Sequence, residues 1–150
     1  MIKRKLETPF VGMSPQVIDY ITQLQVDICA WAERFEPKQR FIADYWQRKQ
    51  GGGGLSCVLE HGDVFEKAGV NISAVSGQLT QKAEQAMFTQ LLSKLNQDTV
   101  DLNHATFVAT GISLVIHPRN PFVPTVHMNY RYFELEHSAG RVWWFGGGTD

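Results

Sequence analysis

The chain has little cysteine, little net charge and no long apolar run. Its 150 residues contain two cysteines, and its formal net charge at pH 7 is -1. Cys29 and Cys57 are too few for a disulfide framework, so we expect buried thiols in a reducing compartment and a cytoplasmic location. A near-neutral chain gives no general reason to expect nucleic acid or an anionic membrane as a partner. No apolar run approaches the roughly 20 residues of a membrane span, and no span is expected.

The apolar content is sufficient for one core. Hydrophobic residues make up 43% of the chain, and a domain of this size buries roughly 70% of its unfolded surface. Residues 1–150 are therefore predicted to form a single domain. The basic residues 1–13 lack the apolar segment of a secretory signal, and we expect them to be a flexible, solvated arm.

Two segments have the periodicity of helices. Ser14-Pro15 predicts a helix start with Ser14 as the N-cap, and Glu36-Pro37 predicts its end. Between them, apolar residues recur every three or four positions and predict one core-facing stripe: Val17, Ile21, Leu24, Ile28, Trp31 and Phe35. Residues 80–96 have a second helical period.

The remaining segments favour strands. They are 41–46, 55–60, 70–75, 107–117, 126–136 and 141–145. Glycines 51–54 are interpreted as a flexible break or a close backbone approach, and Gly62-Asp63 and Ala68-Gly69 as turns. The prolines of 118–124 exclude regular sheet there. This order predicts an α+β fold, a large antiparallel β-sheet flanked by helices.

The last two strands allow a register to be drawn. A hairpin closed over residues 137–140 pairs Glu136 with Arg141 as opposite charges, and a slip of one residue would reverse every face. Continuing this register gives the other pairs: Leu135–Val142, Phe133–Trp144, Arg131–Gly146, Asn129–Gly148 and His127–Asp150. The glycines opposite Asn129 and Arg131 should leave open space for a ligand, with Asp150 at its rim.

A second pairing, across the proline loop, places His117 opposite His127 and Ser113 opposite Arg131. One patch then holds Ser113, His117, His127, Asn129, Arg131 and Asp150. Arginine matches a carboxylate with two hydrogen bonds, and an ionised aspartate accepts from N–H groups. The patch therefore favours a ligand with both carboxylates and N–H donors. Two histidines could also bind a metal or move protons, but they lack a recognised ligand spacing.

Three blocks of the chain resemble one known family. They are GGGGLSCVLEHGDVFEKAGVNISAVSG (51–77), GISLVIHPRNPFVPTVHMNYRYFE (111–134) and VWWFGGGTD (142–150). In this order they are similar to oxygen-dependent coproporphyrinogen III oxidases. The resemblance covers residues 16–150, and 77–106 is its least familiar part.

The resemblance implies a reaction and an assembly. The family converts two propionates of coproporphyrinogen III to vinyl groups, which gives protoporphyrinogen IX in haem biosynthesis. Molecular oxygen is the acceptor, and no organic cofactor is required. Descriptions of the family differ on metal: some assign a divalent ion to histidines, which would here be His117 and His127. The implied fold is a flat antiparallel sheet with helices on both faces, assembled as a homodimer.

The resemblance also implies residue roles. Ser113 and Asn129-Tyr130-Arg131 match substrate-binding positions, with Arg131 suited to a propionate. His127 matches a proton donor, and Asp150 matches an aspartate that holds pyrrole N–H groups. His127, Arg131 and Asp150 are thus the predicted catalytic residues.

Family members are much longer than this chain. These 150 residues are therefore expected to be the N-terminal half of an oxidase, with little or no activity alone. Two other functions stay open, a non-catalytic tetrapyrrole-binding domain and a metal-dependent enzyme that uses His117 and His127.

Overall fold

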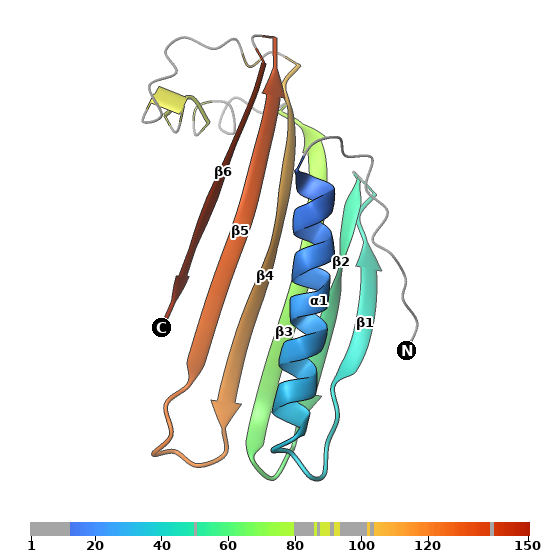
Figure 1. Ribbon diagram of the computed structural model, residues 1–150, viewed down its shortest axis with the longest axis vertical. Helices are drawn as coiled ribbons and strands as arrows, with labels where there is room; N and C mark the ends of the chain where they lie inside the picture. Colours follow the sequence, from blue (N-terminus) through green and yellow to red (C-terminus); the bar gives the residue numbers. More distant parts are fainter. Residues whose placement is uncertain are drawn as a thin grey trace.

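The described residues form one antiparallel sheet with a helix along one of its faces. The computed structural model describes residues 13–49, 51–79, 86, 88–90, 92–93, 102, 104–138 and 140–150. Helix α1 is Ser14–Glu33, and the strands are β1 Ile42–Gln47, β2 Gly52–Glu60, β3 Phe65–Gln78, β4 Thr106–Pro118, β5 Val126–His137 and β6 Gly140–Thr149. Each strand pairs with its neighbour in the chain, in the order β1-β2-β3-β4-β5-β6 (Figure 1). The predicted antiparallel sheet is confirmed.

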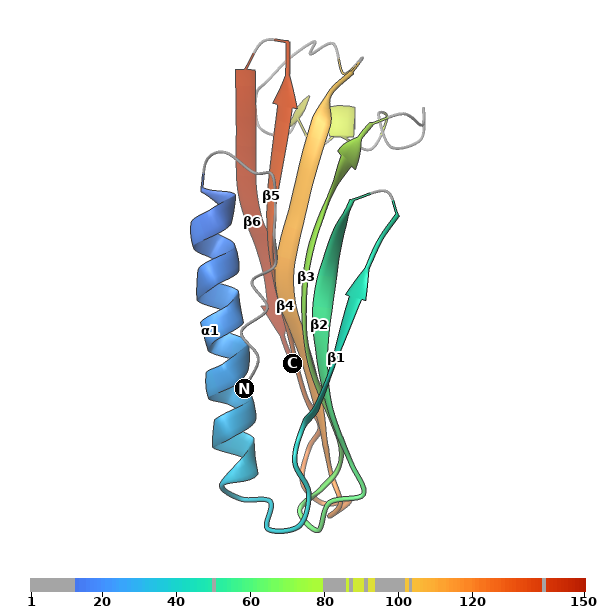
Figure 2. The same ribbon diagram turned by 90° about the vertical axis from the view of Figure 1, so that its right-hand side faces the viewer.

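The prediction of flanking helices is confirmed in part. Helix α1 lies along one face of the sheet (Figure 2), which we call the helix-covered face. The opposite, open face carries described helical residues at one end only, where Phe88 and Leu92 pack against Leu135 and Val142. These belong to the predicted helix 80–96, most of which lies outside the described residues, as do residues 1–12 of the predicted arm.

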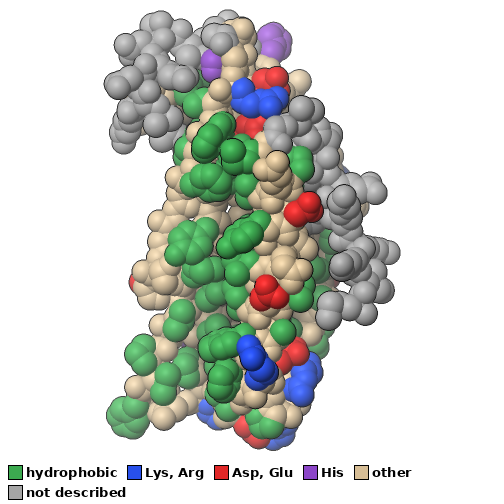
Figure 3. Space-filling model, in the orientation of Figure 1, with side chains coloured by type: hydrophobic (Ala, Val, Ile, Leu, Met, Phe, Trp, Pro, Cys, Tyr) green, Lys and Arg blue, Asp and Glu red, His purple; other side chains and the backbone are tan. Residues whose placement is uncertain are grey.

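The main core lies between α1 and the sheet. Alternate strand residues point to the helix-covered face and meet apolar residues of α1 there. The space-filling view of this face shows hydrophobic side chains gathered over the sheet and the helix (Figure 3). Its buried members include Ile18, Ile21, Val70, Ile72, Ala74, Ile112 and Leu114. Each fully buried isoleucine contributes about 1.5–3 kcal/mol. Cys57 is buried and Cys29 is half-buried, and both are free thiols. No helix among the described residues is both long and apolar enough to cross a bilayer.

Helix α1 differs from its prediction at both ends. Met13 is the N-cap and makes no side-chain cap, while Ser14 is the first helical residue. Trp31 and Phe35 are 47% and 54% exposed, so the predicted core stripe fails at its C-terminal end. The helix ends at Glu33, and the two half-exposed rings contact each other edge to face.

The sheet-facing stripe of α1 contains a polar residue that periodicity did not indicate. The buried amide of Gln25 donates to the carbonyls of Leu55 and Val70 at 2.9 and 2.7 Å. These bonds attach the helix to β2 and β3, and they satisfy a polar group that would be costly to bury alone.

Two predicted interruptions of the sheet lie inside strands. Gly52–Gly54 begin β2, so a flexible break is wrong there, but the close approach is confirmed because the Trp46 ring covers Gly54. Ala68-Gly69 is not a turn, since both residues pair within β3 on both sides. Ala68 is fully buried against the core, and the chain reverses instead at residues 61–64, where the Gly62-Asp63 turn was predicted.

A buried carboxylate joins the loop after α1 to that reversal. Glu36 is fully buried and accepts hydrogen bonds from the backbone N–H groups of Lys38, Asp63, Val64 and Phe65. Burial alone would raise the pKa of Glu36, but these N–H donors outweigh it and lower the pKa from 4.5 to about 2.

We expect Glu36→Gln to lower the Tm by roughly 5 °C or more at neutral pH, because an amide satisfies these donors less well. The folded pKa lies below the unfolded one, so the ionised carboxylate stabilises the fold above about pH 4.5, and this contribution is lost as the pH falls towards about 2. Circular dichroism melts across this range should show the two proteins converging at acid pH. Asp63→Asn, in an exposed ion pair with Lys38, is the control and should change little. Equal shifts for both variants would contradict the prediction.

Candidate active site

The predicted β5–β6 register is confirmed along the hairpin. Arg131 pairs with Gly146 and Asn129 with Gly148. The pairing continues to Asp150, whose backbone exchanges hydrogen bonds of 2.8 and 3.0 Å with His127. An added Cβ at Gly146 or Gly148 would meet nothing within 4 Å. The glycines therefore leave open space beside Arg131 and Asn129, as predicted.

The predicted β4–β5 register is wrong by two residues. Ser113 pairs with Asn129 rather than Arg131, and Val115 rather than His117 pairs with His127. The proline loop between these two strands is bonded to the reversal between β2 and β3. Arg119 donates from its backbone to the Val64 carbonyl at 2.9 Å and from Nε to the Gly62 carbonyl at 2.8 Å. A shift of two preserves parity, so Ser113 still shares a face with Asn129 and Arg131.

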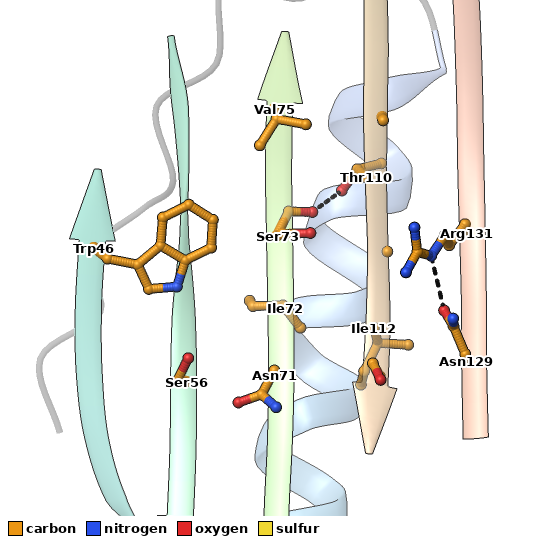
Figure 4. Close-up of a pocket in the computed structure, with 13 residues that line it drawn as sticks. Trp46, Ser56, Asn71, Ile72, Ser73, Val75, Thr110, Ile112, Asn129 and Arg131 are labelled. Atoms are coloured by element: carbon orange, nitrogen blue, oxygen red, sulfur yellow. Dashed lines mark hydrogen bonds between the residues drawn. The ribbon is translucent and has the colours of Figure 1, made fainter. Parts of the chain in front are cut away.

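The side chain of Arg131 lies on the open face and lines its hollow. An added Cβ at Gly111 would come within 3.0 Å of Arg131 Cγ, so the glycine makes room for this side chain. Arg131 Nε donates to Asn129 Oδ1 at 3.0 Å (Figure 4). Arg131 makes no ion pair with any residue in the described ranges, so its terminal N–H groups can take an external carboxylate.

His127 and Asp150 form a pair on the open face, four residues along β5 from Arg131. His127 Nδ1 lies 2.7 Å from Asp150 Oδ1, and the side chains are 45% and 83% exposed. An ionised carboxylate only accepts hydrogen bonds, so Nδ1 carries the proton in this pair. Nε2 is then left to exchange a proton with a ligand, and the second carboxylate oxygen is left to accept from one.

A hollow of about 290 Å³ opens on this face. Of the predicted residues, Ser113, Asn129 and Arg131 line it. Further lining side chains were not predicted from the sequence, among them Trp46, Ser56, Asn71 and Ser73. The alternation of polar Asn71 and Ser73 with apolar Val70, Ile72 and Ala74 was a usable signal, since it places the polar pair opposite the core.

Four predicted residues do not line this hollow. His127 and Asp150 lie further along the β5–β6 pair and are not among its lining residues. Tyr130 points to the helix-covered face, where its hydroxyl lies 2.7 Å from Thr149 Oγ1. His117 is exposed at the end of β4, with Nδ1 3.3 Å from Thr125 Oγ1. No group of three or more metal-binding side chains occurs among the residues that the structure describes, so the two histidines do not complete a metal site there.

The open face thus has the features of a binding site for a ligand with carboxylates and N–H groups. The family model described as "Coproporphyrinogen III oxidase" matches residues 16–150, and the chain belongs to this family. An "Oxygen-dependent coproporphyrinogen-III oxidase" of Drosophila melanogaster is 52% identical over 132 residues, which are 87% of this chain and 33% of the relative.

Two further relatives carry the same description. The human protein, named mitochondrial, is 46% identical over 87% of this chain and 28% of its own length. A Prochlorococcus marinus protein is 44% identical over 97% of this chain and 38% of its own length. The chain thus spans about a third of the length of the curated relatives it matches.

Proposed function

We propose that this chain carries the substrate-binding face of an oxygen-dependent coproporphyrinogen III oxidase. The observation that carries the proposal is Arg131, a cation without an ion pair among the described residues, set beside open space. It shares strand β5 and the open face with His127, which pairs with Asp150. The substrate offers propionates to the guanidinium and pyrrole N–H groups to the aspartate.

Each residue has a task in this proposal. Arg131 holds a propionate, and Ser113 and Asn129 add neutral hydrogen bonds around it. Asp150 accepts from pyrrole N–H groups and favours loss of a proton, which makes the pyrrole more electron-rich. His127, hydrogen-bonded to Asp150, moves a proton through its free ring nitrogen.

In the proposed reaction the substrate and oxygen supply the reacting atoms, and the chain positions them. Each propionate loses carbon dioxide and a β-hydrogen with its electron pair, and a vinyl group remains. Oxygen takes that pair and one further proton and leaves as hydrogen peroxide. The electron-rich pyrrole reacts with oxygen, so these residues contribute orientation and electrostatics.

The roles of Tyr130 and His117, and a homodimer, are proposed on the resemblance alone. Tyr130 would act from the helix-covered face, where it supports Thr149. His117 would need ligands beyond the described residues to hold a divalent ion. The cytoplasmic location is proposed from the free cysteines.

Binding of coproporphyrin III, the stable oxidised form of the substrate, tests this proposal. The wild-type chain should bind it, and Arg131→Gln should weaken binding by roughly 10- to 100-fold, since hydrogen bonds to charged groups contribute about 1.5–3 kcal/mol. Fluorescence titration measures both. Arg34→Gln removes an equal charge beyond the end of α1 and should leave the affinity unchanged. The proposal would be wrong if the wild-type chain did not bind coproporphyrin III. It would also be wrong if wild type and Arg131→Gln bound it with equal affinity.

A further inference from the structure

A row of polar side chains crosses the open face beyond the residues assigned above. Ser56 of β2 pairs with Asn71 of β3, and Asn71 pairs with Ser113 of β4. Ser113 in turn pairs with Asn129 of β5. Paired residues of neighbouring strands point to the same face, so all four side chains open on one side of the sheet.

Two large side chains frame this row. Trp46 lies over Gly54, where an added Cβ would come within 2.3 Å of ring atom Cζ2, and Arg131 lies over Gly111 at the other end. Ser73 lies between them, and Figure 4 shows the ring and the guanidinium on opposite sides of the hollow. The ring lies over β2 and the arginine side chain over β4, which are two strand spacings apart, so the hollow between them spans roughly 10 Å.

The polar groups between the frames are not used by the fold. Ser56, Asn71 and Ser73 are half-buried, and within the described part of the chain their side chains have no hydrogen-bond partner. Polar groups that are half withdrawn from water normally find partners. A ligand would supply them here. The nearest acidic residue in the register is the exposed Asp44, paired with Ser56 at the edge strand.

We propose that Trp46, Asn71 and Ser73 form a distal subsite for a second carboxylate-bearing ring of the ligand that Arg131 holds. This inference rests on the proposed function. The indole packs against the ring, while the Asn71 amide and the Ser73 hydroxyl donate to its carboxylate. The subsite has no cation, so it contributes less affinity than Arg131. It selects ligands that carry carboxylates on both sides of the macrocycle over ligands that carry them on one edge.

Asn71→Asp tests this subsite because it keeps the side-chain size and replaces a donor with a negative charge. The probes are coproporphyrin III, with a propionate on every ring, and deuteroporphyrin IX, with propionates on two neighbouring rings only. The variant should bind coproporphyrin III about 10-fold more weakly, because like charges repel, and deuteroporphyrin IX about as the wild type does. Ser73→Ala should reduce the same selectivity about threefold, through one neutral hydrogen bond.

The control is Gln78→Glu, which adds the same charge at the end of β3 on the helix-covered face and should change neither affinity. Thermal melts of all variants establish that they are folded. No change with Asn71→Asp, or equal weakening of both porphyrins, would overturn the distal subsite. If Arg131→Gln still weakened binding, the proposed function would stand without it. If the wild-type chain bound neither porphyrin, both the distal subsite and the proposed function would be wrong.

Discussion

Gly146→Val and Gly148→Val should each weaken coproporphyrin III binding by roughly 10- to 100-fold while the fold is kept. A Cβ at either position meets no atom within 4 Å, and both residues lie in a strand without a positive φ. Valine suits a strand better than glycine, so stability should rise by about 0.5–1 kcal/mol. The valine side chains would occupy the open space beside Arg131 and Asn129, at an overpacking cost of about 1–3 kcal/mol to a bound ligand.

Gly147→Ala is the matched control, with the opposite pattern. Its Cβ would lie 2.3 Å from the Asn129 carbonyl oxygen and 2.5 Å from Tyr130 Cδ1 on the other face. It should cost about 1–3 kcal/mol of stability, and the folded protein should keep its affinity. Urea unfolding and porphyrin titration separate the two effects. If the valine variants bound normally, the space beside Arg131 would not be part of the ligand site.

Glu134→Leu should lower the free energy of unfolding by about 3 kcal/mol. The fully buried Tyr132 donates its hydroxyl to Glu134 Oε2 at 2.5 Å, and Arg141 Nε lies 3.1 Å from Oε1. Burial, and then the hydrogen bond to Glu134, raise the pKa of Tyr132, so the phenol stays protonated. Removing the carboxylate leaves a buried hydroxyl and a partly buried cation without this acceptor, which is costly.

Chemical denaturation of a double variant separates the two partners of Glu134. Tyr132→Phe combined with Glu134→Leu should recover about 1 kcal/mol, because no phenol is then left unsatisfied. Glu136→Gln is the control. Glu136 forms a 3.4 Å ion pair with Arg141 but is 62% exposed, and the change should cost less than about 1 kcal/mol. A loss no larger for Glu134→Leu than for Glu136→Gln would show that the buried network contributes little.

The register of the β5–β6 hairpin could be predicted from the sequence. A short connection and the charge pair Glu136–Arg141 leave few registers, and parity then assigns a face to every residue up to Asp150. The same reasoning fails across the proline loop. The number of residues in that loop cannot be inferred locally. Arg119 of the loop binds carbonyls of a turn more than 50 residues earlier in the chain.

The helix gives a similar contrast. Periodicity places Ile21 in the core correctly, but it does not show that the last turns of α1 bury Ala32 rather than Trp31. Trp31 and Phe35 are exposed, and Gln25 is buried against carbonyls of β2 and β3. The burial of Glu36 could not be predicted from the sequence either, because the N–H groups that bind its carboxylate come largely from residues 63–65.

The sequence by itself determined which side chains share a face with Arg131, because the two-residue period of a strand is local. It also determined the space beside Arg131, because glycine has no side chain wherever it lies. Only the tertiary structure decided that Trp46, Asn71 and Ser73 line the same hollow, and that Tyr130 and His117 do not. Those placements depend on registers between distant strands, which are set by loop anchoring and by packing against α1.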